Sequence, residues 1–223
     1  MPIQYEDKKF MQYKYDPGYL KTIKGQKTKS DVNLICETLN IATAKTSIVL
    51  DGGNVVKSKH KAIISTRVFK DNLGYPHHNL ISEIKNQLEV KEIILIPEEP
   101  GDFTGHADGV LKFINENTVM LNVYPDDKTY EVFFESIYAA LRNAGLDIYA
   151  MPYTSWKNKS SNDANGCYIN FLEIGNFIFC PVYGLYEDQV AIIELQHCFP
   201  DRKIIGIECT ELAAFGGVLN CAT

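Results

Sequence analysis

The chain has 223 residues, of which 45% are apolar and 22% are charged, and its formal net charge is −6. This composition is typical of one soluble globular domain with its own core, and the acidic charge speaks against a nucleic-acid-binding protein, which presents a basic face. No apolar run reaches the roughly 18 residues of a membrane span, and the N-terminus lacks the apolar core of a signal peptide. We therefore expect a single domain over residues 1–223, with neither nucleic acid nor membrane as a partner.

The cysteines form no C-x-x-C pair, so their spacing favours neither a zinc site nor a compact disulfide framework. Such cysteine usage fits a reducing cytoplasm, which we expect as the location of the protein, and most of these thiols are expected to be inert core residues. The six cysteines are Cys36, Cys167, Cys180, Cys198, Cys209 and Cys221.

The first half of the chain begins with a polar, tyrosine-rich segment over residues 1–31, with a turn at Asp16-Pro17-Gly18 and a lysine-rich stretch expected to be a solvated loop. Residues 32–39 are compatible with either a short helix or a strand. Apolar runs and spacing then predict a strand over 46–50, a hairpin pair of 55–56 with 62–68, a helix over 79–90 and a strand over 93–96.

The second half repeats this order of elements. A polar loop is expected over residues 153–166, either as a flexible insert or as a lid. Helices are predicted over 130–141, closed by Gly145, and over about 186–195. Strands are predicted over residues 110–114, 119–123, 148–151, 168–172, 177–182 and 203–207.

The succession of helix, strand, loop, strand and strand therefore recurs with a period of roughly 50 residues. Self-similarity at a fixed period of this size indicates an α/β repeat or propeller-like architecture, and no break in composition argues for a second domain.

Glycines bracket a histidine and an aspartate in Gly105-His106-Ala107-Asp108-Gly109. In an extended segment, residues two apart point to the same face, so both side chains are expected to face one pocket. A histidine beside a carboxylate is a common basis for proton transfer. The simpler interpretation is a solvated turn.

Three more features lie at predicted strand ends: Asp51 before two glycines, Asn170 within Tyr168–Phe171, and Cys221 after Gly216-Gly217. At equivalent points of successive repeats, these side chains and His106 would converge on one axis. A thiolate nucleophile, a histidine that lowers its pKa and an orienting carboxylate, here Asp51, form a triad-like arrangement. The alternatives are a tight turn at Asp51, a strand-end amide at Asn170 and a free terminal thiol at Cys221.

The ordered set Asp-Gly-Gly-Asn, Gly-His-Ala-Asp-Gly, Tyr-Ile-Asn-Phe and Gly-Gly-x-Leu-Asn-Cys-Ala-Thr resembles the agmatine deiminase family and, equally, the bacterial-type peptidylarginine deiminases. The resemblance runs from about residue 10 to residue 223. It implies the pentein fold, a five-bladed α/β propeller, and hydrolysis of a guanidino compound without a metal or an organic cofactor.

Residue by residue, the resemblance implies that Cys221 is the nucleophile and His106 the general acid and base. It implies that Asp108 holds the substrate guanidinium and that Asp51 contacts the histidine, although agmatine deiminases usually have Glu at that position. Asn170 matches an asparagine near the site in related enzymes and is assigned to substrate binding. The expected partner is therefore a small cationic guanidino substrate.

The family also carries an upstream W-x-R-D-x-G-P segment, whose aspartate is a second guanidinium-binding carboxylate, and this sequence has no match to it. We therefore expect a propeller that lacks most of its first blade, either as a fragment of a longer enzyme or as a degenerate paralogue. Open sheet edges would favour a homo-oligomer.

The leading hypothesis is hydrolysis of agmatine to N-carbamoylputrescine and ammonia through a covalent thiouronium on Cys221. The alternatives are a deiminase of peptidyl-arginine or free arginine, and an impaired guanidino-binding remnant. A thiol hydrolase of the cysteine-protease type is disfavoured because its chemistry needs no guanidinium-pairing carboxylate such as Asp108.

Overall fold

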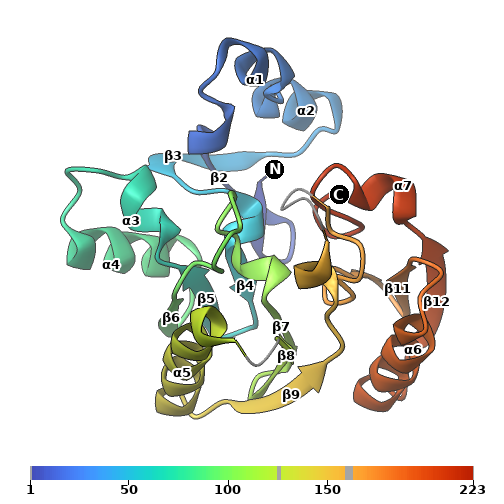
Figure 1. The fold of residues 1–223 in the computed structure, drawn as a ribbon. Coiled ribbons are helices and arrows are strands. Elements are labelled where there is room, and N and C mark those ends of the chain that lie inside the picture. Colours follow the sequence, from blue (N-terminus) through green and yellow to red (C-terminus); the bar gives the residue numbers. More distant parts are fainter. Residues whose placement is uncertain (1, 125–126, 159–162, 223) are drawn as a thin grey trace.

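The computed structural model describes residues 2–124, 127–158 and 163–222, and these form four units of one kind (Figure 1). In each unit two antiparallel strands are followed by a helical segment and by a third strand, which pairs in parallel with the second. Each sheet therefore has three strands with the second strand in the middle. The predicted α/β fold of repeated ββαβ units is confirmed.

The units follow one another along the chain. The first contains β1 (Ile3–Glu6), β2 (Lys9–Lys14), α1 (Ile23–Thr28), α2 (Val32–Thr38) and β3 (Thr43–Val49), and the second contains β4 (Val55–Lys57), β5 (Lys61–Ser65), α3 (Arg67–Asp71), α4 (His77–Gln87) and β6 (Glu92–Ile96). The third contains β7 (Leu111–Asn115), β8 (Thr118–Asn122), α5 (Lys128–Asn143) and β9 (Asp147–Met151), and the fourth contains β10 (Leu172–Ile174), β11 (Phe177–Val182), α6 (Glu187–Cys198), β12 (Lys203–Glu208) and α7 (Thr210–Ala213).

Burial explains why these segments form strands and helices. Strand β5, in the middle of its sheet, is covered on both faces, so it reads as a continuous apolar run, and Ala62–Ile64 within it are fully buried. The helices present one apolar stripe instead. In α5, Phe133, Ile137 and Leu141 recur every four residues and are all buried.

The apolar core is divided among three clusters, each shared mainly by two consecutive units. Met11 and Ile48 of the first unit, for example, pack in one cluster with Ile64 and Leu80 of the second. This packing sets the units around a common centre, and the loops that follow β3, β6, β9 and β12 run into that centre (Figure 1). The residues of these four loops therefore meet although they are far apart in sequence.

Several predictions for single elements need correction. Residues 168–172 do not form a strand: Tyr168, Ile169 and Phe171 are fully buried in an irregular segment, and β10 begins only at Leu172. An apolar run indicates burial but does not by itself specify a strand. Strands β1 and β2 of the first unit, and α1 within the expected lysine-rich loop, were not predicted, because polar residues interrupt their sequences.

Residues 32–39, left open above, begin a helix at Val32, because the Asp31 side chain accepts a hydrogen bond from the Leu34 backbone N–H and caps the helix. Part of the polar loop, residues 159–162, lies outside the described residues. Within the described ranges, no helix has both the length and the apolarity needed to cross a membrane.

Candidate active site

Asp51 and His106 meet from two different units. Asp51 directly precedes the 3-10 turn Gly52–Asn54 after β3, and its Oδ2 lies 3.0 Å from His106 Nε2. The Tyr19 hydroxyl donates a second hydrogen bond to the same oxygen, at 3.2 Å. Burial disfavours a charge on the imidazole, but the hydrogen bond to Asp51 and the charges of Asp108, Asp51 and Asp102 outweigh it. The pKa of His106 is therefore raised above its ordinary value, and the imidazolium is favoured.

The loop that carries His106 is not the extended segment predicted from its sequence. His106 itself has extended backbone angles, but Ala107–Gly109 form a 3-10 turn. The Asp102 carboxylate fixes the approach to this turn by accepting hydrogen bonds from the backbone N–H groups of Gly105 (2.9 Å) and His106 (3.3 Å). The turn still places His106 and Asp108 at one pocket, as expected.

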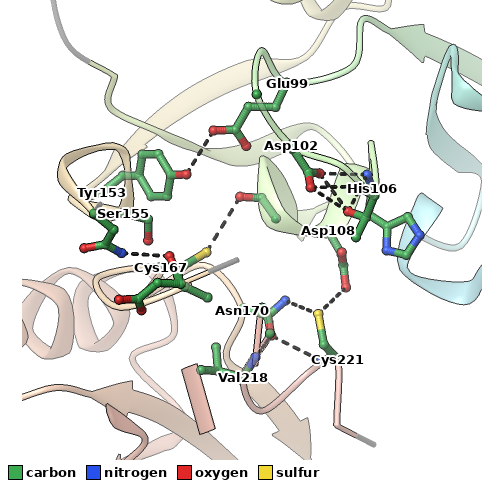
Figure 2. Close-up of a pocket in the computed structure, with 18 of the residues that line it drawn as sticks. Glu99, Asp102, His106, Asp108, Tyr153, Ser155, Cys167, Asn170, Val218 and Cys221 are labelled. Carbon is green, nitrogen blue, oxygen red and sulfur yellow. Dashed lines mark hydrogen bonds between the residues drawn. The ribbon is translucent and has the colours of Figure 1, made fainter. Parts of the chain in front are cut away.

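The sulfur of Cys221 lies between Asp108 and Asn170 (Figure 2). Cys221 Sγ is 3.6 Å from Asp108 Oδ2, and Asn170 Nδ2 donates to Sγ at 3.2 Å. The Asn170 Oδ1 accepts hydrogen bonds from the backbone N–H groups of Val218 (3.3 Å) and Cys221 (3.2 Å). Asn170 therefore orients the cysteine through both ends of its amide, and its assigned role in substrate binding stays a prediction.

The thiol of Cys221 has a strongly perturbed acidity. Desolvation of the sulfur and the neighbouring Asp108 carboxylate raise the pKa of the Cys221 thiol well above its usual range, whereas the hydrogen bond from Asn170 opposes this shift. Without a ligand, the site therefore favours the neutral thiol. A cation that pairs with Asp108 would lower the pKa of the Cys221 thiol again, because it would offset the negative charge of the carboxylate.

Two positions in the motifs must be glycine, because side chains of the site approach their Cα atoms closely. A Cβ on Gly53 would lie 2.6 Å from His106 Nδ1 and 3.1 Å from Asp108 Oδ1. A Cβ on Gly217 would lie 2.7 Å from the Cys221 Cβ. Both glycines leave the space in which the histidine, the carboxylate and the cysteine sit.

Two cavities meet at the predicted site residues. One has a volume of about 270 Å³, near the lower end of small-ligand pockets at roughly 300 Å³. The other is a more open hollow of about 640 Å³ that also reaches Asp51 and Tyr19. His106, Asp108 and Cys221 line both. The structure thus brings all five predicted residues into one region, while their chemical roles remain predictions.

Sequence reasoning missed several residues that surround this region. Asn220 donates from Nδ2 to Asp108 Oδ2 at 2.8 Å, Lys112 donates to Asn220 Oδ1 at 3.2 Å, and Tyr153 donates to Glu99 at 2.9 Å in the smaller cavity. Two features of the sequence could have pointed to these residues: Asn220 is next to Cys221, and Lys112 interrupts the apolar run 110–114.

Curated relatives with one shared name resemble this chain. A protein of Streptococcus mutans with the curated name "Putative agmatine deiminase" is 26% identical, over 85% of this chain and 60% of that protein. An Enterococcus faecalis protein of the same curated name is 23% identical with the same coverage. The chain thus spans about 60% of the length of these curated relatives.

Solved structures share the fold. An agmatine deiminase of C. jejuni superposes with a TM-score of 0.77 at 20% identity, covering 96% of this chain and 66% of that one. An amidinotransferase from Microseira wollei superposes with a TM-score of 0.57 at 12% identity, covering 96% and 65%. The sequence profile of the Porphyromonas-type peptidyl-arginine deiminase family matches residues 1–223. With its whole length matched by that profile, the chain belongs to the Porphyromonas-type peptidyl-arginine deiminase family.

Proposed function

We propose that this site hydrolyses the guanidino group of a small cationic compound, with agmatine as the leading substrate and N-carbamoylputrescine and ammonia as products. The observation that carries the proposal is the placement of one carboxylate, Asp108, against the sulfur of Cys221, with the Asp51–His106 pair lining the same cavity. Relatives named as agmatine deiminases, including a C. jejuni structure described with substrate bound, support the same reaction class.

Substrate binding is expected to activate the nucleophile. A guanidinium is a planar cation that pairs with carboxylates through parallel N–H groups, so Asp108 would hold it beside Cys221. The negative charge of Asp108 is one cause of the raised pKa of the Cys221 thiol. The positive charge of the bound guanidinium would offset that negative charge. Binding therefore favours the thiolate at the moment when the electrophilic carbon is in place.

The covalent step would proceed with His106 as acid and then as base. The Cys221 thiolate attacks the guanidinium carbon, a C–S bond forms, and the C–N bond to one terminal nitrogen breaks as His106 gives that nitrogen a proton. Ammonia leaves and a thiouronium remains on the sulfur. Water, deprotonated by the now neutral His106, attacks the same carbon, the C–S bond breaks, and a ureido product and the thiol are released.

The smaller cavity favours a substrate with a cationic tail. The carboxylates of Asp102 and Asp163 line it, together with Tyr130, Tyr153 and Glu99, whose carboxyl stays largely protonated near neutral pH because burial raises its pKa to about 8. Among its described lining residues, none is a lysine or an arginine that would pair with an α-carboxylate. This charge pattern favours the amine tail of agmatine over the amino-acid end of free arginine.

Peptidyl-arginine is the second candidate. The family profile is that of peptidyl-arginine deiminases, and the open hollow of about 640 Å³ leaves room for a larger substrate beside Cys221. A guanidino-binding protein with impaired activity is the remaining alternative.

The test is release of ammonia by the purified chain from agmatine, free arginine and an arginine peptide, with Cys221→Ser as the control. Mass spectrometry of the unmodified chain, quenched with acid during turnover, would detect a thiouronium adduct on Cys221. We expect turnover of agmatine above the other two substrates. Absence of ammonia and of any adduct, in protein shown to be folded, would reject the proposal in favour of the impaired protein.

A further inference from the structure

Lys112 is a cation that lies behind the site, where it contacts Asn220 but lines neither of the two cavities, and none of the motifs includes it. It lies on β7, and its Nζ donates hydrogen bonds to the Phe171 carbonyl oxygen at 2.5 Å and to Asn220 Oδ1 at 3.2 Å. The same Nζ lies 4.2 Å from the centre of the Phe171 ring. Lys112 thus joins the third unit to the residues that precede β10 and to the turn that carries Cys221.

The contact with Asn220 decides which way that amide points. A lysine ammonium has only donors, so the Asn220 atom that faces it must be the oxygen. The Asn220 NH₂ group is then directed to Asp108 Oδ2, at 2.8 Å. That carboxylate oxygen is also the one that lies 3.6 Å from Cys221 Sγ. Lys112 therefore acts on Asp108 through a single intervening side chain.

Lys112 also brings charge to the site. In the described part of the chain, no carboxylate oxygen forms an ion pair with its Nζ. Burial lowers the pKa of Lys112 below its usual value, and the negative charges of Glu173, Asp108 and Cys221 offset only part of this shift. The ammonium therefore stabilises the Asp108 carboxylate, and also the Cys221 thiolate once it forms, because these groups are removed from water.

We propose that Lys112 is a positioning residue of the site, which holds the Asp108 carboxylate through Asn220 and offsets the negative charge that Asp108 and the Cys221 thiolate bring together. The proposal deepens the deiminase function proposed above, since it names the group that sets both the guanidinium acceptor and the nucleophile. A purely structural lysine would affect stability but not the acidity of Cys221.

The test measures alkylation of Cys221 and therefore needs no turnover. Rates of labelling by neutral iodoacetamide and by cationic 2-chloroacetamidine, a guanidinium mimic, are followed by mass spectrometry of the Cys221 peptide over a range of pH. For Lys112→Met we expect iodoacetamide labelling near neutral pH to slow about tenfold, as a rise of about one unit in the thiol pKa requires. The preference for the amidine should also fall, since Asp108 is no longer held.

Two further variants separate the contributions. Lys112→Gln keeps a donor for Asn220 Oδ1 but has no charge, so it should raise the thiol pKa while it retains the amidine preference. Lys61→Met is the matched control, because Lys61 Nζ also donates to a backbone carbonyl, that of Ala144 at 2.8 Å, whereas the contact with Asn220 belongs to Lys112. It should label as the unmodified chain does.

The proposal is overturned if folded Lys112→Met and Lys112→Gln both label with the pH profile and amidine preference of the unmodified chain. Should Lys112→Met fail to fold, as judged by circular dichroism, the pH profile of Lys112→Gln decides. If the unmodified chain releases no ammonia from any guanidino compound while the labelling shifts occur, the proposed function fails and the role of Lys112 stands.

Discussion

The Asp51 carboxylate lies 3.0 Å from His106 Nε2, although the two residues are 55 positions apart in the sequence. They reach each other because the loops after β3 and β6 both run into the centre of the molecule (Figure 1). Among the described residues, His106 Nδ1 makes no hydrogen bond, so this ring nitrogen is free to exchange a proton with a ligand. The carboxylate fixes the ring and favours its charged form.

Asp51→Asn should lower the pKa of His106, because the amide removes a negative charge and a charge-assisted hydrogen bond. We expect the His106 titration, followed by NMR of the ring protons, to move to lower pH. Deiminase activity near neutral pH should fall roughly 10²-fold, because less of the acid form remains. Tyr19→Phe is a graded control that keeps the carboxylate and should shift the titration less. An unchanged titration in Asp51→Asn would contradict this assignment.

Asp108→Asn should affect two labelling reagents in opposite directions. Removal of the carboxylate removes one cause of the raised thiol pKa of Cys221, so neutral iodoacetamide should label this cysteine about tenfold faster near neutral pH. The cationic amidine should lose its advantage, because its carboxylate partner is gone. Peptide mass spectrometry reports both rates, and a parallel change of the two would show that Asp108 does not hold a cation.

Gly53→Ala should disable the site and spare the fold. The added Cβ would meet His106 Nδ1 at 2.6 Å, so the imidazole must move, and a displacement of this kind costs roughly 10²-fold in rate. Gly109→Ala is the matched control in the neighbouring motif, because its Cβ would meet nothing within 4 Å. Ammonia release and thermal melting of both variants provide the measurement. Equal activity of the two variants would refute the steric argument.

Glu99→Gln should change how stability depends on pH. Burial raises the pKa of Glu99 to about 8 from an ordinary value of 4.5, and the hydrogen bond from Tyr153 opposes this only in part. The folded carboxyl keeps its proton between these values, whereas the unfolded chain releases it. The contribution of protonated Glu99 to the free energy of unfolding is therefore complete below about pH 4.5 and is lost as the pH rises toward 8.

The variant should be stabilised relative to the unmodified chain by a few kcal/mol at pH 8 but not at pH 4.5, since one pKa unit corresponds to about 1.4 kcal/mol. Free energies of unfolding in urea at several pH values measure this difference. His106 contributes in the same direction, because its raised pKa gives stability that is lost as the pH rises, and it cancels in the comparison. A pH-independent difference would contradict the assignment.

The sequence by itself determined the repeated ββαβ pattern and the four loops that carry the site. Apolar periodicity is a local property, and runs such as Ile93–Ile96 or the stripe of α5 need no distant partner to be read. Strands β1 and β2 were not predicted because polar residues interrupt both. Residues 168–171 were predicted as part of a strand because they are mostly apolar and buried, but burial alone does not make a strand.

Only the tertiary structure decided which atoms meet. The 3-10 turn at Ala107–Gly109, the contact of Asn170 with the sulfur and the path from Lys112 through Asn220 to Asp108 depend on how the units pack. Lys112 and Asn220 are 108 positions apart, and no local pattern records such a pairing. Its geometry is set by apolar burial between consecutive units, which brings distant loops to a common centre and leaves their polar groups to satisfy one another.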